Sequence, residues 1–201
     1  MGALVPVALG VYLAVAVDDC KGDRALRDRL DKVDEVLRNE VLQNRKIVRG
    51  NLQYHVALRD SLLVQIGTPT EAEMQGMDSR VLFKHWRGTR MSGLMHGGYE
   101  ASLASGTLTE MPIAQLTHLS NLYNQQENYV YLGRQALQSV TQIGPRTPFL
   151  EAAKFFNSFT IDAYYAETQL LEAMELVLSD LDIPPDTTYA EPRLQWRYAA
   201  Q

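Results

Sequence analysis

The sequence predicts an all-α protein. Apolar residues recur three, four and seven positions apart along most of the 201 residues, which is the spacing of one face of an α-helix. No segment convincingly alternates apolar and polar residues with the period of two that marks a half-buried strand. We therefore expect an N-terminal transmembrane helix that continues into a soluble bundle of three long helices plus short helices.

The N-terminal segment predicts a membrane anchor. Residues 1–17 contain no charged side chain, and the sequence turns polar at Asp18 and Asp19. A helix of this length spans about 25 Å, against a hydrocarbon core of about 30 Å. A cleaved signal peptide is the main alternative, because Ala14-Val15-Ala16 resembles a cleavage site, but the basic leader of such peptides is missing. A buried soluble helix is the third interpretation.

The first long helix is expected to continue from the anchor to about Ile66, because no proline interrupts the apolar period. Gly67 and Pro69 then form a stop signal. A short helix is expected from Thr70, since Thr70 and Glu73 have the spacing of a capping box.

The rest of the chain alternates short and long helical segments. Residues 78–95 mix glycine, arginine and aromatic residues and indicate a short helix and a loop, and residues 97–105 indicate another short helix that ends at Gly106. Two long helices are expected over 113–143 and 149–181, separated by Gly144, Pro145 and Pro148. The expected organisation is an anchor over 1–17, a helical domain over 18–182 and a C-terminal tail over 183–201.

Composition narrows the classes of function. The net charge of −5 argues against nucleic-acid binding, which needs a basic face. Residues 1–100 carry a charge of +1 and residues 101–201 carry −6, so the two halves can pair within the fold or attract partners of opposite sign. Cys20 is the single cysteine, so an internal disulfide is excluded, and one cysteine supplies too few thiolate ligands for a zinc site.

Two stretches resemble an uncharacterised family of bacterial single-pass membrane proteins. Residues 10–19, GVYLAVAVDD, resemble the end of that family's glycine-rich anchor, and residues 99–108, YEASLASGTL, look like a turn of the same family. The chain differs in having Cys20 where the family has tryptophan, and in lacking the basic leader before the anchor. The resemblance implies a helical domain anchored in the bacterial inner membrane, and it implies no activity.

The sequence gives opposite indications of the side of the membrane on which the helical domain lies. Basic residues near the anchor lie on its C-terminal side, at Lys21, Arg24, Arg27, Arg29 and Lys32, and the positive-inside rule then predicts a cytoplasmic domain. The family's basic leader implies a periplasmic domain instead. We favour the periplasm, because the short span suggests that the natural start lies further upstream.

No residue pattern predicts catalysis, and we expect no cofactor. A metal site can be drawn from His96, Glu100, Glu110 and His118, but Gly97 and Gly98 weaken the helix between the first two and no His-Glu-x-x-His motif supports it. A metal-dependent enzyme is therefore the third interpretation of function. A membrane-anchored helical sensor or ligand-binding domain is the second.

Protein–protein interaction is the favoured function. Between Met111 and Gly133 only Glu127 is charged, although the stretch is rich in Asn, Gln and Tyr. Interface cores are depleted in charge and enriched in aromatic residues, and the alternative is a solvent face rich in amides. The candidate interaction residues are Asn121, Tyr123, Asn124, Asn128 and Tyr131, with Trp196 and Tyr198 in the tail.

These observations predict a non-catalytic accessory subunit of a bacterial membrane complex, for example an energy-converting or photosynthetic assembly. Its partners would be other membrane-protein subunits and the lipid bilayer. We expect no nucleic-acid partner and identify no small-molecule substrate.

Overall fold

The structure is a computed structural model that describes residues 4–67, 70–91, 93–144 and 147–193. The side chains before residue 24 and those of residues 71, 72 and 75 lie outside the description. Within the described ranges the chain is helical and holds no β-strand, so the all-α prediction is confirmed.

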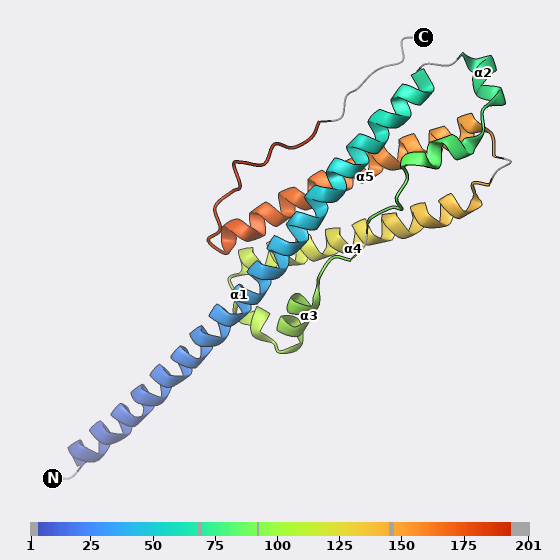
Figure 1. Cartoon of the computed structure of the whole chain (residues 1–201). Coiled ribbons are helices and arrows are strands. Elements are labelled where there is room, and N and C mark those ends of the chain that lie inside the picture. Colours follow the sequence, from blue (N-terminus) through green and yellow to red (C-terminus); the bar gives the residue numbers. More distant parts are fainter. Residues whose placement is uncertain (1–3, 68–69, 92, 145–146, 194–201) are drawn as a thin grey trace.

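The helices follow one another in the predicted order (Figure 1). The long helices are α1 (Leu4–Gly67), α4 (Ile113–Gln142) and α5 (Phe149–Asp180). The short ones are α2 (Glu71–Gly76), the 3-10 helix η1 (Ser79–His85), α3 (Gly97–Ala104) and the 3-10 helix η2 (Thr107–Glu110). Each predicted α-helix is present, and only η2 was not expected.

Local chemistry explains where the helices end. The Thr70 amide donates to Glu73 Oε2 at 2.7 Å, and Thr70 Oγ1 accepts from the Glu73 amide, so the predicted capping box of α2 is confirmed. Gly106 follows α3 with a φ of 71°, a conformation that favours glycine.

Helix α5 packs against both α1 and α4 and runs antiparallel to them (Figure 1). Its apolar face supplies much of the core through Phe156, Phe159, Ala163, Leu170, Met174 and Val177. A second cluster of buried residues lies around Leu58, Leu62 and Phe149, at the end of the bundle where α1 finishes. Burial of the apolar surface in both clusters stabilises the domain.

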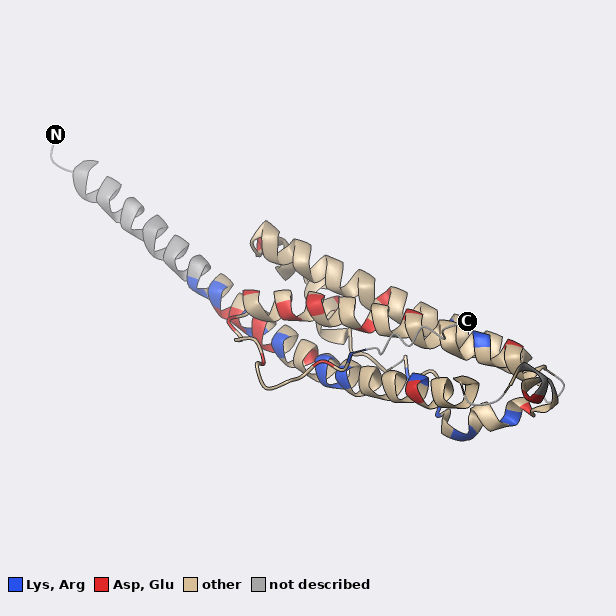
Figure 2. Cartoon of the chain, turned by 90° about the horizontal axis from the view of Figure 1, so that it is seen from above, with Lys and Arg blue, Asp and Glu red and all other residues tan. Residues whose placement is uncertain are grey.

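Helix α1 enters the bundle part-way along its length. Leu37 is its first fully buried residue, whereas the described residues before it are exposed or half-buried. Charged side chains of both signs crowd this preceding part of α1 (Figure 2).

The predicted anchor over residues 1–17 falls at the start of α1. Residues 1–3 and the side chains of residues 4–17 lie outside the described residues. In the part of the chain that was described, no helix combines the length and apolarity needed to cross a membrane.

The basic and acidic halves of the sequence pair with each other across α1 and α5. Arg45 contacts Glu175 at 3.0 Å, and Arg49 contacts Glu175 at 3.2 Å and Asp186 at 2.5 Å. Because Asp186 lies after α5, these pairs also fix the first part of the tail on α1.

Candidate functional site

A segment without regular secondary structure lies between α1 and α4. This segment, residues 87–91 and 93–96 and here called the strap, connects η1 to α3 (Figure 1). It has no neighbouring strand among the described residues, so its partly buried peptide groups need other partners.

Polar side chains of α1 supply those partners. Asn44 Nδ2 donates to the Met95 carbonyl and Asn44 Oδ1 accepts from the Met95 amide, both at 2.7 Å. Asn51 Nδ2 donates to the Arg90 carbonyl at 2.6 Å, and Glu40 Oε2 accepts from the Gly98 amide at 2.7 Å. The spacing of these residues places them on one face of α1.

Helix α4 contacts the strap from the other side. Gln126 Nε2 donates to the Met95 carbonyl at 2.9 Å, and Gln126 Oε1 accepts from Asn44 at 3.2 Å. A Cβ atom built on Gly133 would lie 2.5 Å from the Met91 Cβ. Helix α4 therefore needs a glycine where the strap crosses it.

A histidine–glutamate–tyrosine cluster lies at the centre of this network. His55 Nδ1 lies 2.8 Å from Glu167 Oε1, and Tyr129 donates to the same oxygen at 3.0 Å. His55 Nε2 donates to the Thr89 carbonyl at 2.9 Å, because a carbonyl can only accept. His55 and Glu167 thus share one proton along Nδ1–Oε1, either as an ion pair or as a neutral pair.

The cluster is closed to solvent. His55 and Glu167 are both 0% exposed. Burial raises the pKa of Glu167, and the hydrogen bonds from His55 and Tyr129 only partly oppose this rise. The groups resemble an acid–base pair in chemistry, but they bind backbone and each other rather than facing a cleft.

A second buried carboxylate holds Tyr123. The Tyr123 hydroxyl donates to Glu40 Oε1, and the Tyr123 ring stacks on Tyr99 with centroids 4.0 Å apart. Burial, followed by the contact with Glu40, raises the pKa of Tyr123. Tyr123 was predicted on an interaction surface, but it lies in the interior because it packs against α1 and α3.

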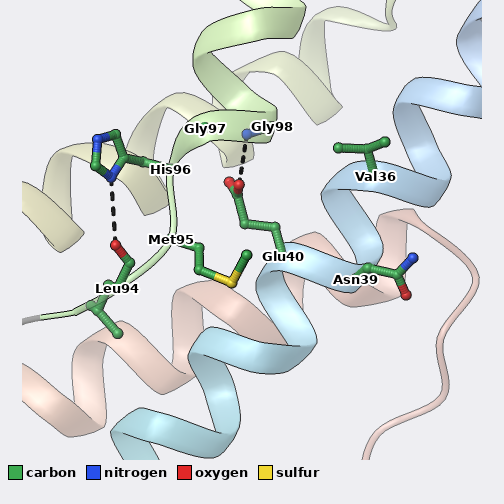
Figure 3. A pocket seen from close by; sticks show the side chains of 8 residues that line it. All are labelled: Val36, Asn39, Glu40, Leu94, Met95, His96, Gly97 and Gly98. Atoms are coloured by element: carbon green, nitrogen blue, oxygen red, sulfur yellow. Dashed lines mark hydrogen bonds between the residues drawn. The ribbon is translucent and has the colours of Figure 1, made fainter.

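A shallow groove of about 570 Å³ lies where α1, the strap and α3 meet (Figure 3). Val36 and Met95 line it from α1 and the strap, and Glu40 lies between them. Because the Glu40 carboxylate is held by the Gly98 amide and Tyr123, the groove offers mainly apolar contact.

The histidines proposed as metal ligands take part in separate pairs. His96 Nε2 lies 3.4 Å from Glu100 Oε1, and His118 Nδ1 lies 2.7 Å from Asp180 Oδ2. Over the described ranges, no three His, Cys, Asp or Glu side chains are grouped as metal ligands. The structure therefore does not bring the four predicted residues together.

The outward face of α4 carries almost no charge. One stripe of exposed residues runs nearly the whole helix and is here called the amide stripe: Thr117, Asn121, Asn124, Asn128, Tyr131, Gln135, Gln138 and Gln142. Tyr131 is 61% exposed. Only Glu127 and Arg134 are charged on this exposed face. Of the other predicted interaction residues, Trp196 and Tyr198 lie outside the described residues.

Sequence reasoning missed the buried polar face of α1. The available signal was a set of polar residues four, seven and four positions apart, Glu40, Asn44, Asn51 and His55, interleaved with Leu37, Val41, Val48 and Leu52. Such residues are ordinarily assigned to solvent, because buried polar groups cost free energy unless they are paired.

The fold and site define an all-α chain with a buried polar network and an uncharged helix face. Comparison with profiles of known protein families, with curated protein sequences and with solved structures finds no match.

Proposed function

We propose that the protein is a non-catalytic accessory subunit of a bacterial membrane complex. Residues 1–17 anchor it in the inner membrane, and the amide stripe of α4 docks on partner subunits. The observation that carries the proposal is the stripe itself, which is exposed over most of a 30-residue helix and contains no charge.

Solvent-facing helix surfaces are usually rich in Lys, Arg, Asp and Glu, which keep a protein soluble and separate from its neighbours. Interface cores are instead depleted in charge and enriched in tyrosine. The amide stripe has this composition, and Tyr131 lies near its middle, where an aromatic anchor contributes most.

The buried polar groups support a structural role. Glu40, Asn44, Asn51 and His55 all bind backbone groups of the strap or of Gly98. Their hydrogen bonds give one rigid arrangement of three helices and the strap, and a rigid surface loses less entropy on docking.

A ligand-binding or sensor domain is the second candidate, and the groove beside Val36 and Met95 favours it. A groove of this size accommodates a small apolar group. Ligand binding there would be abolished by Val36→Arg, which leaves the amide stripe unchanged.

The proposal is tested by purifying the tagged full-length protein in mild detergent. Tyr131→Ala should release the co-purifying subunits, since a buried aromatic anchor contributes about 2 kcal/mol or more at an interface. Tyr165→Ala is the matched control, because Tyr165 is 47% exposed but lies on α5.

The alternatives predict different results. If His96→Ala combined with His118→Ala abolished function while Tyr131→Ala changed nothing, a metal-dependent activity would replace the structural role. The anchor is tested separately, by mass spectrometry of the membrane-extracted protein. Recovery of the N-terminal peptide supports an uncleaved span, and a mature chain that starts at Val17 contradicts it.

A further inference from the structure

Residues 79–99, which form η1, the strap and the start of α3, are a basic part of an acidic protein. They contain four Lys or Arg residues and no Asp or Glu, whereas the whole chain carries −5, so the rest of the chain carries −9. Arg80 pairs with Asp78. Arg87 and Arg90 are exposed, and no carboxylate of the described residues forms an ion pair with either of them.

Tyr54 of α1 brings these two arginines to one place. Its hydroxyl accepts from the Arg87 amide at 2.8 Å and donates to the Gly88 carbonyl at 3.2 Å. The guanidinium carbon of Arg90 lies 5.1 Å from the centre of the Tyr54 ring, within the range of a cation–π contact. Burial raises the pKa of Tyr54, while the bond from the Arg87 amide and the positive charges of Arg90 and Arg87 oppose this rise. Both charges therefore lie beside the same phenol.

The backbone of Arg90 is held in an unfavourable conformation. Its φ is 52°, in the left-handed region that favours glycine. Asn51 Nδ2 donates to the Arg90 carbonyl at 2.6 Å and helps to keep this conformation. Backbone strain persists only where the surrounding structure fixes it, and it is concentrated at binding and switch sites. Here it accompanies a charged side chain that rests on Tyr54.

Two positioned arginines without carboxylate partners suit an anionic ligand. The guanidinium group is planar and offers paired donors, which match the oxygen atoms of a carboxylate or a phosphate. Side chains that are already positioned lose less entropy when a ligand binds. The chemistry of Arg87 and Arg90 therefore selects anions.

The rest of the molecule narrows the source of the anion. A nucleic acid needs an extended basic face, and the charge of −9 on the rest of the chain repels a long polyanion. Helix α1 is continuous from Leu4 to Gly67, so Tyr54 lies about 55 Å along it from Val17, where the proposed anchor ends. The bilayer that holds the anchor is thus distant from the site, a step that rests on the proposed function.

We propose that Arg87 and Arg90, positioned by Tyr54, bind the carboxylates of a short acidic segment of a partner protein. This site gives the proposed accessory subunit a second contact of defined chemistry. The strap packs on α4 at Gly133, which is buried, whereas the amide stripe is the exposed face of the same helix. The two contacts therefore use different surfaces.

Fluorescence anisotropy with labelled hexaglutamate tests the site in the purified full-length protein, in neutral detergent at low salt. Arg87→Gln combined with Arg90→Gln should weaken binding about tenfold, because two exposed charge pairs are lost. Arg24→Gln combined with Arg29→Gln is the matched control, since it removes the same charge from exposed positions of α1 and should leave the affinity unchanged. Equal affinities of the two double variants would overturn the inference.

Tyr54→Phe separates a positioned pair from a general attraction of charges. It keeps both arginines and the aromatic ring, but it removes the hydroxyl that binds the strap at Arg87 and Gly88. Peptide binding should weaken while the helical circular dichroism spectrum stays the same. Unchanged binding would mean that charge alone attracts the peptide, and the positioned site would be wrong.

Other anions are tested as competitors of the labelled peptide. Unlabelled hexaglutamate should displace it at a lower concentration than dihexanoylphosphatidylglycerol or a single-stranded hexanucleotide. If either phosphate compound displaced it more readily, phosphate groups would be the ligand and the inference would be overturned. The absence of any peptide binding would overturn it as well.

The peptide assay also separates this site from the proposed docking of the amide stripe. The assay contains no other subunit, and Tyr131→Ala should bind the peptide as the unaltered protein does, because Tyr131 lies on the other surface of α4. A loss of peptide binding in Tyr131→Ala would contradict the separate site. Failure of the peptide to bind leaves the co-purification test of the proposed function unaffected.

Discussion

The side chain of Asn44 bonds both backbone groups of Met95, as a neighbouring strand would in a β-sheet. Its amide group donates to the Met95 carbonyl and accepts from the Met95 amide, as a neighbouring backbone would. Sequence patterns do not show such a role, because the paired residues are 51 positions apart. These hydrogen bonds provide partners for both backbone groups of Met95, which are partly buried.

Asn44→Ala should therefore lower the free energy of unfolding by about 2 kcal/mol, since it removes the hydrogen bonds of a buried side chain to Met95 and Gln126, each worth about 0.5–1.5 kcal/mol. Asn39→Ala is the matched control in the same helix, because Asn39 is exposed. Both variants share the change in helix propensity, so their difference measures the contacts of Asn44 with the strap and with Gln126. Urea unfolding followed by circular dichroism measures this difference, and equal stabilities would show that these contacts contribute nothing.

The buried Tyr123 predicts a loss of stability at alkaline pH. Burial and Glu40 raise its pKa in the folded protein above the ordinary value of 10.0. The unfolded chain then loses the phenol proton at lower pH than the folded protein. The free energy of unfolding is therefore unaffected by this phenol well below pH 10. Above pH 10 it falls as the unfolded chain ionises, with a slope that approaches about 1.4 kcal/mol per pH unit for one group.

Tyr123→Phe should flatten this dependence. Between pH 10 and pH 11 the free energy of unfolding should fall by about 1 kcal/mol less than in the unaltered protein, because the phenol of the unfolded chain is half ionised at pH 10. Tyr131→Phe should follow the unaltered protein, because Tyr131 is exposed. Denaturant titrations at several pH values make the comparison, and parallel curves for all three proteins would contradict it.

At the scale of elements, the strap approaches α4 so closely that α4 requires a glycine at position 133. An added methyl group would meet the Met91 Cβ at 2.5 Å and the Met91 carbonyl oxygen at 2.9 Å. A backbone oxygen cannot move aside as a flexible side chain can. The strap and α4 therefore fit together only with a glycine at this position.

Two substitutions of glycine by alanine should change the stability of the protein in opposite directions. Gly133→Ala should destabilise the protein by about 1–3 kcal/mol through overpacking. Gly50→Ala, in α1, should stabilise it by about 0.5–1 kcal/mol, because nothing lies within 4 Å of the added methyl group and alanine favours helix. Thermal unfolding midpoints read both effects, and stabilisation by Gly133→Ala would mean that the strap does not approach α4 closely.

The helices were predictable from sequence, whereas the strap was not. Gly67, Gly106 and Pro148 lie where helices end or begin, so local chemistry alone sets these boundaries. The strap has no period of its own, and its position depends on polar residues of α1 that resemble a solvent face. Asn121, Asn124, Asn128 and Tyr131 are exposed, as both an interaction surface and an amide-rich solvent face require, while the buried position of Tyr123 depends on α1 and α3.

At the scale of the whole molecule, the basic and acidic halves of the sequence are joined by ion pairs. Arg45 and Arg49 from the basic half both contact Glu175 from the acidic half, and Arg49 also contacts Asp186 in the tail. Hydrogen bonds from Thr188 and from Arg49 lower the pKa of Asp186, so this contact persists as a charged pair into acid.

Glu175→Gln should destabilise the whole bundle by about 1 kcal/mol, because it leaves two mostly buried arginines with weaker partners while the solvent still screens part of the loss. Glu172→Gln is the matched control, since Glu172 lies on the exposed side of the same helix. The difference between the two variants should shrink in 1 M salt, where charges are screened over about 3 Å. Equal stability of the two variants at low salt would mean that the pairs of Glu175 with Arg45 and Arg49 do not stabilise the fold.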